Sequence, residues 1–512
     1  MIDLNHILLF IAIVSPAILL VRIARRRDRR NHGWRIAATI VLAVSVLAWV
    51  LLPSVAGFVG GTLWCLLLVI PSVSERKIDE LLRTQRFAAA RGLAVVRRGL
   101  HPWEDSPYLP ALFRDLELAS AGRLDLALDR LAQERNEGTP SGRFATALIF
   151  ALTENWSGLL QWCRHDPALK TNPALFSLYL RALGETGALD ELVFQYASQA
   201  ERHGVDSAAL YNLGLVLAFC GRTQDFVRLT EQRMPRLQEQ FWRATAELAE
   251  GKREIACRRL EKLRGETRDA LLRRSIERRL TLAQKSAPLT APSERLLDRF
   301  VAEAAGQRGA AARPGLEGAP AVLTLILVNL VFFGAELVLG GSTNSATLKF
   351  LGELEPEAVV VRHEYWRLLT ALFLHYGALH LAINLFALYL LGPPLERLIG
   401  SAKFVVGYLL SGLGSGAGVI FLGAIGLTNA TELVGASGAI MGVIGVSAGL
   451  LLRHRQSTLA GRQLQNILFI VAIQTVFDLW TPQVSLAAHL SGFVSGVGIG
   501  VIFASMERHT AS

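Results

Sequence analysis

The main candidate for a catalytic residue in this chain is Ser437. It is framed by Gly435 and Gly438 at the start of an apolar stretch that runs to Leu452. A lone serine among small residues is most often a packing residue, because small residues let membrane helices approach closely. To act as a nucleophile, its hydroxyl needs water, a base that takes its proton and donors that stabilise an oxyanion.

Candidates for the base and the donors lie in two other apolar segments. His489 lies near the outer end of the last segment, at the depth expected for Ser437, and could serve as the general base. His380 and Asn384 are four residues apart, so they share one face of a helix, whereas His375 is interpreted as structural or interfacial. Imidazoles at membrane depth are costly and usually functional. Together these residues predict a hydrolytic site inside the membrane, for which no metal ion or organic cofactor is implied.

The apolar segments that position these residues fall into two regions. Of the 512 residues, 51% are hydrophobic and 19% are charged, which is too apolar for an ordinary soluble protein. The predicted membrane spans are residues 7–23, 36–52, 55–73, 321–339, 368–391, 404–425, 434–452, 464–479 and 484–504. The predicted fold class is therefore all-α, a polytopic membrane protein with three N-terminal spans and a six-helix core.

The positive charges indicate how these spans are oriented. The formal net charge is +10, but the arginine clusters flank apolar segments, as the positive-inside rule requires, so nucleic acid is not an expected partner. Five arginines follow the first span closely: Arg25, Arg26, Arg27, Arg29 and Arg30. They place residues 75–310 in the cytoplasm. We expect a multi-pass protein of a bacterial-type inner (cell) membrane, with the Ser437 site opening to the outer side.

The charged segment between the two membrane regions shows a helical repeat. Gly187 and Gly221 are 34 residues apart, and both stand in turns between amphipathic helical patterns. A period of this length resembles tetratricopeptide (TPR) repeats, which stack into a solenoid. The turns around Gly122 and Gly251 depart from the period, so a generic bundle of helical hairpins is the alternative. In both cases the segment would present a surface for a soluble protein partner.

These patterns divide the chain into five parts. We predict a membrane anchor in 1–74, a cytoplasmic TPR-like domain in 75–285, a linker in 286–320, the six-span core in 321–505 and a cytoplasmic tail in 506–512. The linker is rich in Ala, Pro and Gly and has room for one short helix at 293–305 before it becomes flexible. The four cysteines are widely spaced, so we expect reduced thiols and no structural zinc site.

Several short motifs accompany the candidate residues in the last 190 or so positions, as the printed sequence shows. They are Trp366-Arg367 in the first outer loop, His375 with His380 and Asn384, Leu395-Glu396 with Gly400-Ser401, Gly435-Ala436-Ser437-Gly438, and Ala488-His489 with Gly492 and Gly496. In their order and on their spans, these motifs resemble the rhomboid family of intramembrane serine proteases. The resemblance covers about residues 321–505. It implies cleavage of transmembrane segments of other membrane proteins, preferably of helices that unwind readily.

The resemblance also implies catalytic roles. Ser437 would be the nucleophile and His489 the general base, while Asn384 and His380 would form the oxyanion hole with the backbone N–H of Ser437. No acidic residue is evident beside His489, which fits a Ser–His dyad without the aspartate of a triad.

Other residues would support the site. Trp366 and Arg367 would brace the first outer loop. The glycines Gly435, Gly438 and Gly492 would allow the helices of the serine and the histidine to pack closely. The family often carries a tyrosine four residues after the serine, where this chain has Met441. We expect this difference to alter the orientation or the pKa of the histidine and not to abolish activity.

Two other classes of function remain as alternatives. A catalytically silent rhomboid-like binder would recruit membrane clients through its repeats, although silent relatives usually lose the serine or the histidine. A transporter would carry intramembrane charges and inverted repeats. Asp478 is the sole acid within the last three predicted spans and stands at a span end, which disfavours a transporter.

Overall fold

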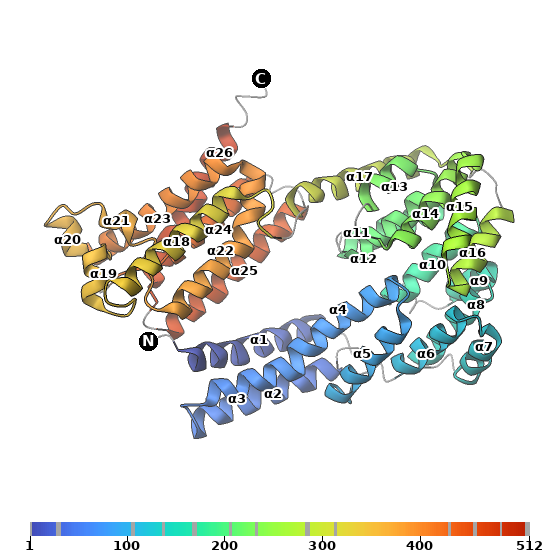
Figure 1. The fold of residues 1–512 in the computed structure, drawn as a ribbon, viewed down its shortest axis with the longest axis horizontal. Helices are drawn as coiled ribbons and strands as arrows, with labels where there is room; N and C mark the ends of the chain where they lie inside the picture. The colour runs from blue at the N-terminus through green and yellow to red at the C-terminus, as the bar shows by residue number, and fades with distance from the viewer. Residues whose placement is uncertain are drawn as a thin grey trace. The chain divides into compact units, whose positions relative to one another are not determined.

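The computed structural model confirms the all-α fold class and divides the chain into two compact units (Figure 1). It describes residues 3–26, 32–103, 108–135, 139–165, 172–203, 207–230, 234–281, 287–311, 315–428, 432–453, 458–481 and 484–506. One unit comprises residues 8–305, and the other comprises residues 306–512 together with residues 1–7.

The first unit begins with three apolar helical stretches that are long enough to cross a membrane. They are α1 (Leu4–Arg26), α2 (His32–Leu51) and a continuous stretch built from α3 (Ala56–Trp64), a π-helical turn (Cys65–Val69) and α4 (Ile70–Arg83). The third stretch extends beyond the predicted span end at Val73, because α4 continues as an amphipathic helix into the charged segment. The three N-terminal spans expected from hydropathy are therefore present.

A helical domain follows, built from short antiparallel hairpins. Its helices are α5 (Phe87–Leu100), α6 (Leu109–Ser120), α7 (Leu124–Gln133), α8 (Pro140–Leu152), α9 (Trp156–His165), α10 (Pro173–Glu185), α11 (Leu189–His203), α12 (Ser207–Phe219), α13 (Thr223–Thr230), α14 (Arg236–Glu250), α15 (Arg253–Glu266), α16 (Ala270–Thr281) and α17 (Ala291–Ala311). The predicted turn glycines all have positive φ, from +71° at Gly221 to +95° at Gly251. At Gly221 a side chain would also meet the backbone of α14, 2.9 Å from Glu250 N.

The last helix of this unit, α17, lies in the segment that the sequence assigns to the linker. Its residues Leu297 and Phe300 are buried in the same hydrophobic core as α10 to α16. Thr290, just before α17, donates hydrogen bonds from its backbone N–H and its hydroxyl to Asp190, at 3.0 and 2.8 Å. The core of the helical domain thus extends to about residue 305.

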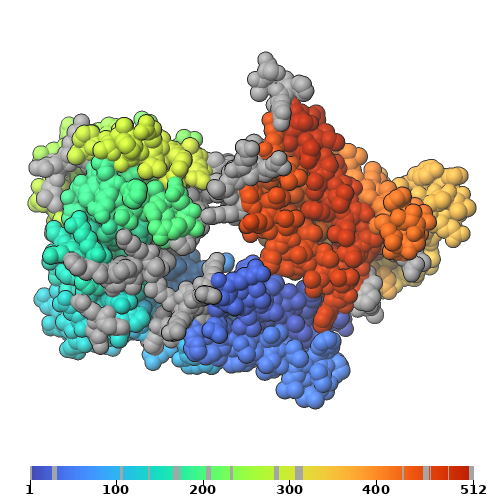
Figure 2. Space-filling model, turned by 180° about the vertical axis from the view of Figure 1, so that it is seen from behind, coloured from blue at the N-terminus to red at the C-terminus, as the bar shows by residue number. Residues whose placement is uncertain are grey.

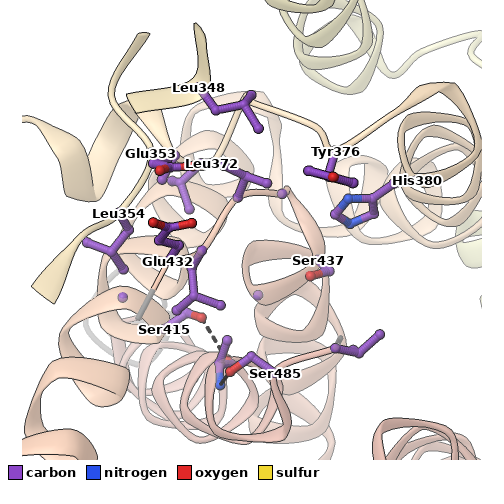
Figure 3. A pocket seen from close by; sticks show the side chains of 18 of the residues that line it. Leu348, Glu353, Leu354, Leu372, Tyr376, His380, Ser415, Glu432, Ser437 and Ser485 are labelled. Atoms are coloured by element: carbon purple, nitrogen blue, oxygen red, sulfur yellow. Dashed lines mark hydrogen bonds between the residues drawn. The ribbon is translucent and has the colours of Figure 1, made fainter. Parts of the chain in front are cut away.

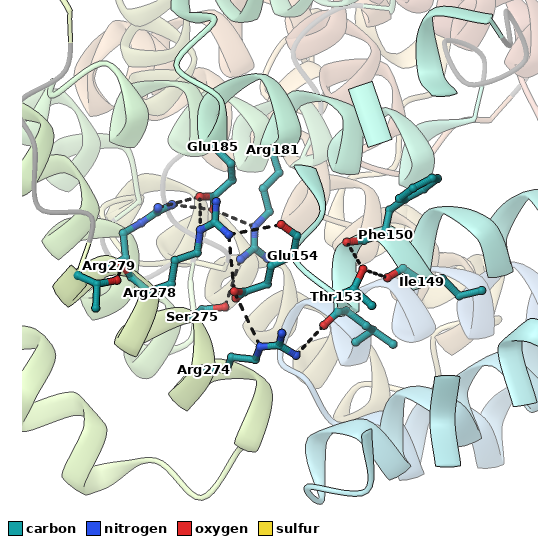
Figure 4. A network of polar contacts seen from close by, with 12 residues as sticks. Ile149, Phe150, Thr153, Glu154, Arg181, Glu185, Arg274, Ser275, Arg278 and Arg279 are labelled. Carbon is teal, nitrogen blue, oxygen red and sulfur yellow. Dashed lines mark hydrogen bonds and ion pairs between the residues drawn. The ribbon is translucent and has the colours of Figure 1, made fainter. Parts of the chain in front are cut away.

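A polar network crosses the interior of the helical domain (Figure 4). Glu185, at the end of α10, has a 2% exposed side chain and accepts two hydrogen bonds of 2.7 Å from Arg279. Arg274 donates to the carbonyl of Leu152 and Arg278 to that of Glu154, so both arginines satisfy the end of α8. Burial alone would raise the pKa of Glu185, but attraction by Arg279 and Arg181 holds that pKa below its usual value.

The second unit carries the candidate chemistry. Its helices are α18 (Pro320–Val338), α19 (Ser345–Leu351), α20 (Pro356–Val360), α21 (Arg367–Thr370), α22 (Ala378–Ile399), α23 (Ser401–Ala424), α24 (Ser437–Leu452), α25 (Thr458–Trp480) and α26 (Leu486–Met506). Five of them are long and apolar enough to span a membrane, and with the three N-terminal stretches they make eight candidate spans in the described ranges. The 16-residue α24 is a shorter apolar helix among them.

One predicted span differs from the structure at its start. The segment expected to be helical from residue 368 contains a short α21 and a non-helical stretch, and α22 begins only at Ala378. Gly377 has φ +89°, and the backbone N–H of His375 donates to Glu336 on α18 at 2.8 Å. Because this donor is held by a residue of another helix, the chain does not continue a helical ladder there.

Helices α24 and α26 pack backbone to backbone. A Cβ atom at Gly492 would collide with the carbonyl oxygen of Gly438, and one at Gly496 would collide with that of Gly442. The opposite side of α26 carries exposed apolar side chains, namely Leu490, Val494, Val501 and Ile502. This helix, red in Figure 2, lies on the visible face of its unit. The spacing of the glycines thus brings the serine and histidine helices together, and the outer apolar side is suited to lipid.

Candidate active site

Ser437 and His489 line one cavity of about 540 Å³ in the second unit. His380, Gly435 and Gly438 also line it. Figure 3 shows Ser437, His380 and Tyr376 toward one side of this cavity and Glu353 and Glu432 toward the other. In the described part of the chain, no hydrogen bond joins the hydroxyl of Ser437 to the ring of His489. Catalytic hydrogen bonds are often long or poorly aligned in structures without substrate, so the shared cavity keeps the two residues as a candidate pair.

Ser437 is the first residue of α24, and two backbone contacts hold the segment that leads to it. Leu433 and Leu354 form an isolated antiparallel bridge with N···O distances of 2.9 and 3.0 Å. The N–H of Gly435 donates to the carbonyl of Ala371 at 2.9 Å. The residue before the helix, Ala436, provides no side-chain cap, so the first amides of α24 have no side-chain acceptor at the cap.

His380 and Asn384 lie behind this segment on α22. A Cβ atom at Gly435 would lie 2.8 Å from the His380 ring and 3.7 Å from Nδ2 of Asn384, and Gly435 has φ +127°. Only glycine fits this position, for both reasons. Asn384 is 4% exposed, and its Nδ2 has no hydrogen-bond partner among the described residues. A buried donor without a partner is costly, so this amide is a candidate ligand-binding donor.

The ring of His489 forms a hydrogen bond with the carboxyl group of Asp478. Its Nδ1 lies 2.8 Å from Oδ2 of Asp478, and the two side chains are 5% and 1% exposed. Gln474 donates to the other oxygen of Asp478 at 2.8 Å and lies 3.4 Å from the same ring nitrogen. Asp478 and Gln474 belong to α25, while His489 is in the first turn of α26.

The prediction that no acidic residue lies beside His489 is therefore wrong. In the sequence, Asp478 stands eleven positions before His489 and at the end of the preceding span. The reversal of the chain between α25 and α26 brings the two side chains into contact. The sequence contained one signal for this contact. Asp478 is the sole acid in the last three predicted spans, and ionisable residues in membrane spans are usually functional.

Trp366 and Arg367 do not line the cavity but organise the loop between α18 and α22. Arg367 donates to the carbonyls of Lys349 and Glu353, each at 3.0 Å, and also pairs with Glu364. Its guanidinium lies over the Trp366 ring, 4.8 Å from the ring centroid. These contacts fix the segment that carries Glu353 and so shape the far side of the cavity.

Three further residues that belong to the sequence motifs or lie near them are His375, Glu396 and Met441. His375 is fully buried, and its ring packs edge-on against that of His380 at 5.3 Å between centroids. Glu396 accepts from the backbone N–H groups of Ala321 and Val322, at 2.8 Å each, and so caps α18. Met441 is buried on α24. Glu336, which holds the N–H of His375, was not singled out from the sequence.

The region that carries these residues matches a known family. Residues 362–506 match the family model of the Rhomboid domain. This range contains Asn384, Ser437, Asp478 and His489. The C-terminal part of this multi-pass membrane protein is thus homologous to rhomboid proteases.

Individual relatives extend this finding. The chain is 35% identical over 175 residues to rhomboid protease GluP of Bacillus subtilis, covering 34% of this chain and 32% of the relative. It is 37% identical over 162 residues to the mitochondrial RHOMBOID-like protein 6 of Arabidopsis thaliana, covering 31% and 50%. RHOMBOID-like protein 1 of the same plant is 34% identical over 162 residues, covering 31% and 40%. The matches therefore span half or less of the length of these relatives.

Proposed function

We propose that this protein is a serine endopeptidase that cleaves membrane proteins within or beside their transmembrane segments. The observation that carries the proposal is that Ser437 lines one cavity with His489, whose Nδ1 is engaged by Asp478. Similarity to rhomboid proteases over residues 362–506 supports the same class of reaction.

The first step would transfer the proton of the Ser437 hydroxyl to His489. Asp478 accepts a hydrogen bond from Nδ1–H, which leaves the lone pair of a neutral ring on Nε2. As Ser437 Oγ attacks the scissile carbonyl, Nε2 takes its proton, and the carboxylate of Asp478 stabilises the imidazolium. Asp478 thus replaces the predicted dyad by a Ser–His–Asp arrangement.

The oxyanion that forms on the attacked carbonyl needs donors. We assign these to the backbone N–H at the start of α24 and to Nδ2 of Asn384, with His380 beside them. The helix N-terminus also carries a partial positive charge that favours an anion. One such donor typically contributes about 3–4 kcal/mol to transition-state stabilisation.

The remaining steps use the same groups. His489 returns its proton to the leaving amine, and the C–N bond breaks to leave an acyl ester on Ser437. Water then enters the cavity, gives a proton to His489 and attacks the ester. As the second tetrahedral intermediate collapses, the C–O bond to Ser437 breaks, His489 gives its proton to Ser437 Oγ, and the new carboxylate is released.

Cleavage by the reconstituted protein tests the proposal. Wild type and Ser437→Ala would be placed in liposomes with a model transmembrane substrate. We expect cleavage by the wild type alone, and labelling of Ser437 by a fluorophosphonate in the wild type alone. A folded wild type that neither cleaves nor reacts would support the alternative of a catalytically silent binder of membrane clients.

We also propose an orientation and a role for the helical domain. The arginines near α1 support a cytoplasmic helical domain and a cavity that opens to the outer side. A reporter inserted near Gly221 should then give a cytoplasmic signal. If the domain docks a soluble partner or a substrate tail, deletion of residues 75–310 should change substrate choice and spare cleavage of a generic substrate. Loss of all cleavage by a folded truncation would mean that the domain supports the core instead.

A further inference from the structure

The side of the cavity away from Ser437 in Figure 3 carries two acidic side chains, Glu353 and Glu432. Together with Glu355, they have carboxylate oxygens that lie within 4.8 Å of one another. Acidic groups on an outer loop are common, so this proximity alone identifies no ligand. The burial and the hydrogen bonding of Glu353 distinguish this cluster from an ordinary acidic surface.

Glu353 is buried and lacks a partner for one of its oxygens. It is 3% exposed, and its Oε1 has no hydrogen-bond partner among the described residues. Burial raises the pKa of Glu353 to about 7, and the negative charge of Glu432 contributes to the same increase. A carboxylate in this setting would be stabilised by a cation that enters from the cavity.

The neighbouring charges are already compensated. Lys349 lies 2.6 Å from Glu432 and 3.3 Å from Glu355. Arg362 pairs with Glu355 at 2.8 Å. The guanidinium of Arg367 donates a hydrogen bond to the carbonyl oxygen of Glu353 and pairs with the carboxylate of Glu364. Glu353 is therefore the member of the cluster whose carboxylate has a free buried acceptor.

The backbone around Glu353 is held in place. Gly352 ends α19 with φ +100° and packs against the Trp366 ring, and Leu354 forms the bridge to Leu433. The same bridge holds the segment that leads to Ser437. The backbone that carries Glu353 is thus joined directly to the segment that leads to the proposed nucleophile, as a specificity site requires.

We propose that Glu353 binds an arginine or lysine side chain of the substrate, close to the scissile bond. This inference rests on the proposed proteolytic function. Glu353 lines the same cavity as Ser437, so one bound substrate could contact both residues. The basic residue would therefore lie in the part of the substrate that enters this cavity. A divalent ion would have to displace Lys349 from Glu432 and Glu355, whereas a basic side chain needs only Glu353.

Paired substrates test this inference. Model transmembrane substrates would carry Arg or Gln at each position around the cleavage site, and kcat/KM would be measured with the full-length protein in liposomes containing EDTA. For the wild type we expect one position at which Arg is preferred over Gln by about tenfold, the effect of one charge-assisted hydrogen bond. Glu353→Gln should bring this ratio close to one.

Two other variants sharpen the result. Glu357→Gln makes the same charge change on the exposed side of α20, away from the cavity, and should keep the wild-type ratio. Lys349→Gln removes the ammonium that competes for the cluster, and should increase the preference for Arg. This second variant tests the inference even if Glu353→Gln fails to fold.

The outcomes separate the inference from the function on which it rests. Cleavage of Arg and Gln substrates at equal rates by the wild type would overturn the inference and leave the protease intact. A preference for Arg that persists in a folded Glu353→Gln variant would also overturn it. A rate that requires added Ca²⁺ or Mg²⁺ and is lost in Glu353→Gln would show that the cluster holds a metal ion instead. No cleavage of any substrate by a folded wild type would overturn the proposed function.

Discussion

The Nδ1 atom of His489 and the Oδ2 atom of Asp478 lie 2.8 Å apart, and both side chains are buried. The acid is on α25 and the histidine on α26, so the pair connects two helices at the edge of the cavity. A buried carboxylate at this ring nitrogen selects the tautomer that leaves Nε2 free to accept a proton. This contact is therefore the part of the proposed catalytic site that substitutions can test most directly.

We expect Asp478→Asn to lower kcat by about 10²–10⁴-fold with little change in KM, because an amide can donate to Nδ1 and favour the wrong tautomer. Asp478→Glu should recover part of the loss, since it restores an acceptor. Both would be measured with the reconstituted protein and a transmembrane peptide substrate. A folded Asp478→Asn variant with wild-type kcat would show that the contact with His489 is only structural.

Asn384→Ala should separate activity from stability. Its Nδ2 donor has no partner in the described residues, so its removal relieves a buried unsatisfied group that costs about 1–3 kcal/mol. We expect kcat to fall by about 10²–10³-fold, as for loss of one oxyanion donor, without a decrease in the unfolding temperature. A matching loss of stability would instead indicate that Asn384 holds α22 in place.

The contact between α24 and α26 offers a matched pair of substitutions on one helix. Gly496→Ala would drive a methyl group into the carbonyl of Gly442, whereas a Cβ atom at Gly498 meets nothing within 4 Å. We expect Gly496→Ala to destabilise the core by about 1–3 kcal/mol and to reduce cleavage, while Gly498→Ala changes neither. Thermal unfolding in detergent and the cleavage assay would check both. Equal effects of the two substitutions would contradict the observed packing.

The interior network of the helical domain predicts a pH dependence. The pKa of Glu185 is lowered, so its contribution to stability is complete above the unfolded value of about 4.3 and is lost as pH falls through the folded value. Glu185→Gln should cost about 3–5 kcal/mol at pH 7, because Arg279 loses its buried partner.

The difference between Glu185→Gln and the wild type should shrink below about pH 4, where the carboxyl becomes protonated. Urea unfolding of the full-length protein would measure it at both pH values. Glu254→Gln removes a largely exposed ion pair with Arg258 and should behave as the wild type. A difference that stays constant with pH would show that packing, and not charge, is responsible.

The sequence by itself determined the features that depend on local patterns. Hydropathy located the spans, since each needs a run of apolar residues. The four-residue spacing of small residues around Ser437 and His489 predicted that their helices pack together. Turn glycines such as Gly187 and Gly221 located the hairpins of the helical domain. The similarity of the last region to rhomboid proteases follows from the same local motifs.

Only the tertiary structure decided how distant side chains meet. Asp478 reaches His489 because α25 and α26 reverse direction, which periodicity does not encode. Glu336 holds the N–H of His375, 39 residues away, and so delays the start of α22 to Ala378. Glu353 belongs to a charged loop and reads as a solvent-exposed acid, yet the Leu354–Leu433 bridge and Arg367 bury it. In each case the deciding free energy comes from hydrogen bonds and burial between segments far apart in the chain.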